Sequence, residues 1–338
     1  MNTSRTVCAV VLTYNRQRLL TSCLHHLLGQ TRPLNHILVV DNGSSDGTHA
    51  LLALDFPGVE VLVLPRNVGA AGGFVAGMEF ACRSGADLLW LMDDDAYPRP
   101  DALERLLEHS SGQEVLIPWQ ASAAGELYGV SQWRDSGVAS VTPSSSEATP
   151  TVQMFSFIGP LIPRTVIESI GLPYADYFID FFDWEYSLRL HQAGVRALLV
   201  PGSVIDHEAG QTRPKRFLGV GRVRMRYWQP AWRVYYDTRN FLLTVRRRHL
   251  GGRAVAFFLA KQLREMLREL AFEEDGTLRV RLRLLATVDG LCGVSGERPG
   301  LLAPVTQKAV LSSPGKGEDI AAPLCGVQDT QPGHRSVS

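Results

Sequence analysis

The stretch DLLWLMDDD at residues 87–95 joins an apolar run to three consecutive acids. The run from Leu88 to Met92 has the length and composition of a strand that is buried on both faces. Asp93, Asp94 and Asp95 follow directly at its carboxyl end. Adjacent carboxylates repel one another, so a bound cation is expected to neutralise them at the end of a buried strand.

A hard divalent cation with oxygen ligands fits this cluster, and Mg²⁺ or Mn²⁺ typically shares its coordination shell with substrate phosphates. In extended backbone, Asp93 and Asp95 would point to one side and Asp94 to the other. The alternative interpretation of the three acids is a solvated loop that caps a helix beginning near Pro100.

Three further apolar runs have strand character, at 7–12, 36–40 and 59–64. Leucines at helical spacing between residues 19 and 28 separate the first two runs, and a Gly-rich segment at 67–77 followed by a helix precedes the acidic stretch. This alternation predicts a mostly parallel α/β sheet with helices on both faces. Polar clusters follow the strands at 13–16, 41–48 and 93–95, at the edge where such sheets bind ligands.

The rest of the chain is predicted to be less regular. Residues 120–150 have the composition of a loop or hairpin, and a short helix is expected around 163–170. Residues 211–253 are basic and aromatic, whereas 254–290 show helical periodicity through Leu259, Leu263, Leu267 and Leu270. We therefore divide the chain into an α/β domain at 1–210, a mainly helical basic region at 211–295 and a disordered tail at 296–338.

Charge is distributed unevenly along the chain. Residues 1–205 contain 12 Lys and Arg against 21 Asp and Glu, and the remainder contains 22 against 13. Carboxylates in the first part suit a cation, and cations in the second suit phosphates or an anionic membrane. The five cysteines have no CxxC spacing, so neither a disulfide framework nor a zinc site is expected. With no leader-like or membrane-spanning segment in the sequence, we expect a cytoplasmic protein, peripheral on the inner face of the cell membrane.

Five motifs in order resemble family 2 glycosyltransferases. They are TYNR at 13–16, VVDNGSSDGT at 39–48, RNVGAAGG at 66–73, WLMDDDA at 90–96 and DWE at 183–185. The resemblance covers about residues 5–250 and implies the GT-A fold, with residues 1–210 as the nucleotide-sugar-binding and catalytic domain. In that family a DxD motif holds the metal that bridges the donor diphosphate. By resemblance, Asp93 and Asp95 are the ligands of Mn²⁺ or Mg²⁺ here.

The resemblance also implies which residues bind the nucleotide-sugar donor. Asp41 would accept a hydrogen bond from the base, although Asp41 and its neighbours Ser44, Ser45 and Asp46 also suit an Asx turn or a helix cap. Glycines after the third strand would let the backbone approach the nucleotide-sugar closely. The full set of donor-binding candidates is Thr13, Asn15, Arg16, Asp41, Asn67, Gly69, Gly72, Gly73 and Asp94.

Asp183 is the candidate general base, because an inverting transfer needs a carboxylate within reach of the acceptor hydroxyl. Asp180 is the rival candidate. Glu185 has a catalytic and a structural interpretation, the second being an ion pair with Arg189 at i+4. His207 is a candidate third metal ligand by resemblance, and its imidazole would favour Mn²⁺ modestly over Mg²⁺.

Residues 213–253 contain twelve Lys and Arg but one acid, Asp237, interleaved with tyrosines and tryptophans. Nucleic-acid binding is disfavoured, because no nucleic-acid motif is present and the acidic half would repel phosphates. Attachment to an anionic membrane that carries lipid-linked acceptors fits better, with some arginines alternatively contacting the donor diphosphate. A homo-oligomer is a further possible partner state.

The motifs are most similar to those of bacterial galactofuranosyltransferases, with rhamnosyltransferases next. YYDTRN at 235–240 resembles a segment common in both groups. The implied function is inverting transfer from a UDP- or dTDP-sugar to a glycan or lipid-linked acceptor of a cell-wall or surface polysaccharide. The alternatives are a nucleotidyltransferase, which would carry a Gly-rich loop in the first strand–helix turn, and a non-catalytic sugar- or membrane-binding module.

Overall fold

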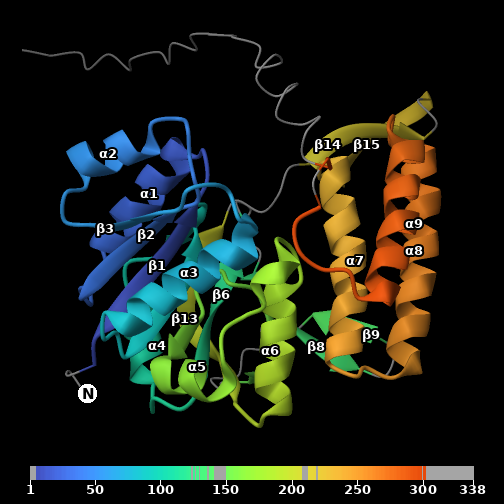
Figure 1. The fold of residues 1–338 in the computed structure, drawn as a ribbon. Helices are drawn as coiled ribbons and strands as arrows, with labels where there is room; N and C mark the ends of the chain where they lie inside the picture. Colours follow the sequence, from blue (N-terminus) through green and yellow to red (C-terminus); the bar gives the residue numbers. More distant parts are fainter. Residues whose placement is uncertain are drawn as a thin grey trace, which may run out of the picture. The chain divides into compact units, whose positions relative to one another are not determined.

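The predicted alternation of strands and helices is present in the computed structural model of the chain (Figure 1). The structure describes residues 5–122, 125, 127–128, 130–134, 137–140, 150–207, 212–217, 220–298 and 300–301. The chain divides into two compact units, residues 1–297 and 298–338. The helices and strands described here all belong to the first unit.

The main sheet runs in the order β10-β13-β6-β12-β4-β1-β2-β3. Strands β1, β2, β3 and β4 are mutually parallel, as is the pair β6 and β13, whereas β12 is antiparallel to both of its neighbours. The parallel strands bring the polar clusters that follow them to one edge of the sheet. The strands of this path are β1 (Val7–Thr13), β2 (His36–Asp41), β3 (Glu60–Val63), β4 (Leu88–Asp93), β6 (Val115–Ala121), β10 (Thr151–Val152), β12 (Leu161–Pro163) and β13 (Ala197–His207).

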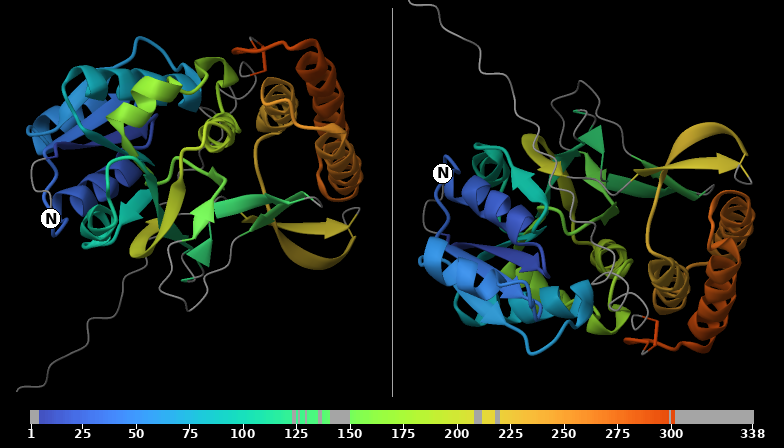
Figure 2. Two further views of the ribbon diagram at one scale, coloured as in Figure 1. Left: turned by 90° about the horizontal axis from the view of Figure 1, so that it is seen from below. Right: turned by 90° about the horizontal axis from the view of Figure 1, so that it is seen from above.

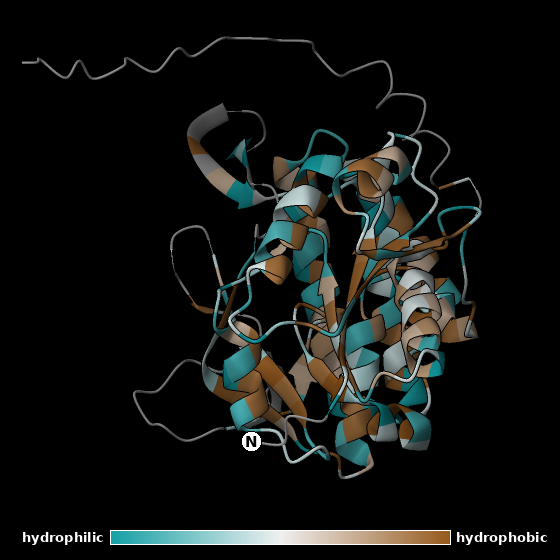
Figure 3. Ribbon diagram, turned by 90° about the vertical axis from the view of Figure 1, so that its left-hand side faces the viewer, coloured by the Kyte–Doolittle hydropathy of each residue, from teal (hydrophilic) through white to brown (hydrophobic). Residues whose placement is uncertain are grey.

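Helices cover both faces of the sheet, because successive strand side chains point to opposite sides. Val10 and Leu12 contribute to the core under one set of helices, α3 (Gly69–Arg83), α5 (Arg164–Ile170) and α6 (Phe182–Gln192). Ala9 and Val11 contribute to the core under α1 (Gln17–Leu28), α2 (Thr48–Asp55) and α4 (Ala102–Glu108). Figure 3 shows hydrophobic strands between helices that carry both kinds of residue.

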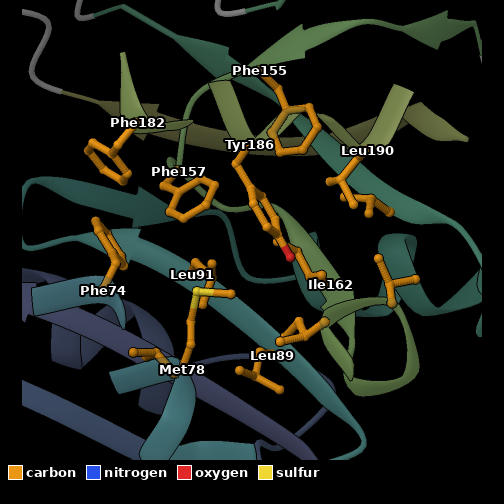
Figure 4. Packing of buried hydrophobic residues seen from close by; sticks show 14 of the residues in the cluster. Phe74, Met78, Leu89, Leu91, Phe155, Phe157, Ile162, Phe182, Tyr186 and Leu190 are labelled. Carbon is orange, nitrogen blue, oxygen red and sulfur yellow. The ribbon is translucent and has the colours of Figure 1, made fainter. Parts of the chain in front are cut away.

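An aromatic cluster joins α3 and α6 to the sheet (Figure 4). The Phe157 ring lies 5.3 Å from the rings of Phe74 and Phe182, and 5.8 Å from that of Tyr186. Phe182 directly precedes the candidate base, so this packing fixes the first turn of α6 against the sheet.

Three helices follow the sheet, with α7 (Ala231–Arg247) between the α/β part and the pair α8 (Gly252–Phe272) and α9 (Gly276–Cys292) (Figures 1 and 2). The predicted helical region at 254–290 is therefore two helices joined by a turn at 273–275. Before α7, β14 (Thr212–Phe217) and β15 (Val220–Tyr227) form a hairpin. None of the described helices combines the length and the apolar composition needed to cross a bilayer.

The Gly-rich segment at 67–77, expected to precede a helix, is itself mostly helical, since α3 begins at Gly69. A helix this close to a sheet needs small residues on its inner face. A Cβ on Gly77 would lie 2.6 Å from Val10 Cγ1, and one on Gly73 would overlap Leu12. Packing against the strands therefore explains glycines that otherwise disfavour a helix.

The predicted loop or hairpin at 120–150 lies only partly within the described residues, as β7 (Leu127–Tyr128), β8 (Val130–Arg134) and β9 (Gly137–Ser140). Strand β11 (Met154–Phe155) pairs with β8. The predicted disordered tail lies almost entirely outside the described residues. The domain boundary after residue 210 stays a prediction.

Candidate active site

The three acids lie at the carboxyl end of β4, where the strand ends at Asp93. Asp94 is buried and accepts a hydrogen bond of 2.7 Å from Thr13 Oγ1. Arg16 Nη1 lies 3.1 Å from Asp94 Oδ1 and 3.0 Å from Asp95 Oδ2. The expected alternation of side chains is therefore wrong here. Asp94 and Asp95 lie in a turn, and both carboxylates reach one guanidinium.

Strand pairing brings His207 to the same cluster. Strand β13 runs antiparallel to the short β5 (Ala96–Pro98), with His207 opposite Ala96. His207 Nε2 consequently lies 3.3 Å from Asp95 Oδ1. Two residues 112 positions apart in the sequence thus meet because β5 directly follows the acids.

The electrostatics of the cluster favour a bound cation. Burial raises the pKa of Asp93 to about 7, with a further contribution from the charges of Asp95 and Asp94. Burial also raises the pKa of Asp94 to about 6, against the opposing effects of Arg16 and Thr13. Burial acts on Asp95 in the same direction, but the hydrogen bond and charge of His207, together with the charge of Arg16 and a backbone hydrogen bond, outweigh it, and the pKa of Asp95 is lowered.

The donor set also fits a divalent ion that is completed by substrate. Among the described residues, no ion pair or side-chain hydrogen bond engages the Asp93 carboxylate. No three His, Cys, Asp or Glu side chains in that part of the chain form a ready-made metal site. Carboxylate oxygens with one imidazole suit Mg²⁺ or Mn²⁺, whose remaining ligands commonly come from phosphates and water.

The loops after β1 and β2 are joined to each other beside this cluster. Asn15, in left-handed backbone with φ 54°, accepts a hydrogen bond of 2.7 Å from the Ser45 N–H through Oδ1. Ser44 Oγ accepts one of 2.9 Å from the Asn15 N–H. Asp41 Oδ1 accepts one of 2.9 Å from the Ser44 N–H. This bond between a side chain and a following backbone N–H is the turn contact that the sequence offered as the alternative role of Asp41. Asp41 is thus buried at the end of β2.

The start of α3 is built around Asn67 and Gly69. Asn67 Oδ1 accepts hydrogen bonds from the Gly69 N–H at 2.8 Å and from Asn42 Nδ2 at 3.2 Å. Gly69 has φ +78°, and a Cβ there would overlap the carbonyl oxygen of Phe178. A Cβ on Gly72 would lie 2.8 Å from Val68 Cγ2. Close packing thus requires these glycines.

Asp183 lies in the first turn of α6. Its carboxylate accepts backbone hydrogen bonds from Trp184, at 2.8 Å, and from Phe157. The Phe157 segment is tied to β4 through Gly159, whose N–H donates to the Leu91 carbonyl at 2.7 Å. Burial, together with the nearby charge of Asp180, raises the pKa of Asp183 to about 7.

The backbone before α6 is strained. Phe178, Asp180 and Phe181 have φ values of 66°, 58° and 63°. These values lie in the left-handed region, which residues other than glycine rarely adopt. Such strain concentrates at sites where the surrounding structure holds it in place. Residues 175–181 are called the base loop below.

The two rival acids are engaged elsewhere. Asp180 forms a two-pronged ion pair with Arg233, at 3.0 Å from Nε and 2.7 Å from Nη2. Glu185 is fully buried, with Arg189 at 3.2 Å and Arg248 at 3.1 Å. The structural interpretation of Glu185 is therefore the one that the geometry supports.

Comparison with known proteins identifies the family. The family model for glycosyl transferase family 2 matches residues 8–147. Galactofuranosyltransferase GlfT1 of Mycobacterium tuberculosis is 32% identical over 249 residues, which span 70% of this chain and 81% of that protein. The chain belongs to glycosyl transferase family 2. The predicted family is thus confirmed, and the nucleotidyltransferase alternative is set aside.

Two further comparisons extend over more of this glycosyltransferase. The dTDP-rhamnosyl transferase RfbF of Shigella flexneri is 24% identical over 301 residues, covering 86% of this chain and 97% of that protein. Residues 1–349 of S. aureus TarS, solved with UDP-GlcNAc, superpose with a TM-score of 0.55 at 15% identity, over 86% of this chain and 81% of that one. The predicted GT-A fold is confirmed.

A contact that the sequence analysis missed holds the base loop of the glycosyltransferase in place. Asn240 Nδ2, on α7, donates to the backbone carbonyls of Tyr177 at 2.9 Å, Ile179 at 2.5 Å and Asp180 at 3.0 Å. Arg239 Nη2 donates to the Tyr177 carbonyl at 3.1 Å. Both α7 side chains are buried. The signal in the sequence is the polar run Asp237–Asn240 between the apolar residues of α7.

The same contacts give part of the basic, aromatic segment a structural role. Tyr235 and Tyr236 are fully buried rather than available to a membrane. Arg233, Arg247 and Arg248 pair with acids of the base loop and α6, namely Asp180, Asp176 and Glu185. These cations therefore stabilise the fold around the candidate base, because buried or half-buried carboxylates need partners.

Asn240→Ala is expected to lower the free energy of unfolding by about 1–3 kcal/mol, because buried carbonyls lose their donor. Turnover should fall roughly 10- to 100-fold through misplacement of the base loop, while donor affinity changes little. Thermal unfolding and steady-state kinetics measure both effects. Arg246→Ala, on an exposed part of α7, is the control. Unchanged turnover in Asn240→Ala would show that the loop holds its position without this clamp.

Proposed function

We propose that this enzyme is an inverting glycosyltransferase that moves galactofuranose or rhamnose from a UDP- or dTDP-sugar to a glycan or lipid-linked acceptor. The observation that carries the proposal is the half-buried carboxylate of Asp183, which lies in the first turn of α6 and, unlike those of Asp180 and Glu185, has no arginine partner among the described residues. The names of GlfT1, a galactofuranosyltransferase, and RfbF, a dTDP-rhamnosyl transferase, support the two sugars and the dTDP-linked donor. The proposal includes a role in cell-wall or surface polysaccharide synthesis.

In this proposal the edge formed by the loops after β1 and β2, the start of α3 and the end of β4 binds the donor. Asp93, Asp95 and His207 would hold Mn²⁺ or Mg²⁺, and the bound ion would stabilise negative charge on the departing diphosphate. Arg16 lies against Asp94 and Asp95 and would add positive charge at the same place. The residues proposed for the nucleotide-sugar are Thr13, Asn15, Arg16, Asp41, Asn67, Gly69, Gly72, Gly73 and Asp94.

Asp183 would act as the general base. Its ionised carboxylate accepts the proton of the acceptor hydroxyl, and the acceptor oxygen bonds to the anomeric carbon. The bond from that carbon to the diphosphate oxygen breaks, and the nucleoside diphosphate leaves with the electron pair. Attack opposite the leaving group inverts the anomeric configuration. A pKa raised to about 7 keeps the carboxylate basic enough for this step.

A lipid-linked acceptor would place the reaction at a membrane. We propose that residues 1–210 bind the donor and catalyse transfer, while residues 211–295 bring the enzyme to the cytoplasmic face of the cell membrane as a peripheral protein. The surplus of cations in the second half of the chain supports this division.

Hydrolysis of nucleotide-sugars without acceptor tests the proposed donor. UDP-galactofuranose and dTDP-rhamnose would be compared with UDP-galactopyranose and GDP-mannose in the presence of Mn²⁺. We expect one of the first two to be cleaved fastest, with no cleavage in Asp183→Asn beyond background. Preferential cleavage of GDP-mannose would reject the donor assignment, and failure to bind any of the four would reject the site.

A further inference from the structure

Helices α8 and α9 each expose a set of apolar side chains. On α8 these residues repeat at i, i+4, i+8 and i+11, which places them on one helical face. On α9 a second set points outward in the same way. Their exposed fractions lie between 36% and 61%. The residues of this outer leucine face are Leu259, Leu263, Leu267 and Leu270 on α8, and Leu278, Leu284, Leu285, Val288 and Leu291 on α9.

The inner faces of both helices are already packed, so the outer leucines are not needed for the fold. Phe258 of α8 stacks on Phe241 of α7 with ring centres 4.4 Å apart. Arg283 of α9 forms paired hydrogen bonds of 2.8 Å with Glu269 of α8. Gly290 of α9 packs against Leu242 of α7. Figures 1 and 2 show α8 and α9 side by side on the outside of α7.

The exposed charged side chains of α8 and α9 are arginines, and on α8 they lie beside the row of leucines. One exposed acid, Glu274, lies in the turn between the two helices. Arg253, Arg264, Arg268 and Arg281 are exposed. The acids within α8 and α9 are Glu265, Glu269 and Asp289, and none of them is exposed. Glu265 is shared by Arg264 and Arg268, at 3.6 Å and 2.9 Å. An apolar face with this surplus of arginines complements an anionic surface with an apolar interior.

We infer that the outer leucine face docks onto an anionic lipid monolayer, with the leucines at the boundary between headgroups and acyl chains. This inference rests on the proposed lipid-linked acceptor. It assigns the membrane contact to the outer leucine face, since the tyrosines of α7 at 235 and 236 are buried. Charge disfavours a second copy as the occupant. In a two-fold symmetric dimer each copy would present the same four exposed arginines, and Glu274 in the turn between the helices is the one exposed acid at residues 252–292 to meet them.

Flotation with lipid vesicles tests the docking face on the full chain. Wild type is expected to float with vesicles of phosphatidylcholine and phosphatidylglycerol and to bind vesicles of phosphatidylcholine alone weakly. The triple variant Leu259→Gln, Leu263→Gln and Leu267→Gln keeps good helix formers at exposed positions, and its vesicle affinity should fall at least about 100-fold. Arg264→Gln with Arg268→Gln should lose the preference for phosphatidylglycerol.

Matched controls separate this face from exposed leucines in general. Leu28→Gln and Leu54→Gln remove leucines that are 60% and 79% exposed on α1 and α2, and should leave flotation unchanged. Wild-type flotation by the triple variant would overturn the inference. A second contradicting result would be a wild-type dimer, seen in sedimentation velocity, that the triple variant no longer forms although it still binds vesicles. Donor hydrolysis in lipid-free buffer tests the proposed function independently, because these variants should retain it.

Discussion

Asp183→Asn is expected to lower turnover by about 10²–10⁴-fold, the range for loss of a general base, with donor affinity close to that of wild type. The amide oxygen can still accept the backbone hydrogen bond from the Trp184 N–H, so the start of α6 should keep its geometry. The defect should therefore be confined to proton transfer. Steady-state kinetics, with donor affinity measured by calorimetry, separates the two quantities.

The pH dependence of turnover is a second test of Asp183 as the general base. Because the base must be ionised, and the pKa of Asp183 is raised to about 7, turnover should rise with pH up to about 7 and then level off. Asp180→Asn is the matched comparison, since Asp180 is held by Arg233. Loss of this pH limb in Asp180→Asn, with turnover preserved in Asp183→Asn, would move the base assignment to Asp180.

Asp95→Asn is expected to reduce turnover by roughly 100-fold or more, because a metal that stabilises the leaving diphosphate contributes several kcal/mol to transition-state binding. The same substitution should weaken donor binding, which distinguishes it from Asp183→Asn. Asp206→Asn is the control. Asp206 neighbours His207 on β13 but is half-exposed and paired with Arg99 at 2.9 Å. Equal losses in Asp95→Asn and Asp206→Asn would point to a disturbed β13 instead of a lost ligand.

The sheet could be predicted because its strands are short apolar runs whose burial leaves little choice of structure. The runs before Asp41 and Asp93 are strands that end at these residues. Parallel pairing of β1 with β2 and β4 then gathers their polar ends. The acid cluster was predictable for the same reason. A residue that directly follows a strand lies at the edge of the sheet where that strand ends.

Contacts between distant segments could not be predicted from such local patterns. The turn at Asp94 and Asp95 broke the expected alternation because the strand ended one residue before it. The clamp from Asn240 to the base loop joins residues about 60 positions apart, and depends on how α7 packs. The leucines of α8 are spaced as on one face of a helix, which the sequence predicted. Their spacing alone does not tell whether this face packs against the protein or is exposed.

Calorimetric titration of UDP into the wild-type enzyme, in Mn²⁺ and in EDTA, tests most directly whether the end of β4 is a metal-dependent donor site. Asp93, with its raised pKa and no ion-pair partner among the described residues, motivates this measurement. We expect binding in Mn²⁺, and a loss of affinity in EDTA that Asp95→Asn reproduces even when Mn²⁺ is present. Equal affinity for UDP in Mn²⁺ and in EDTA would contradict the metal role of Asp93 and Asp95.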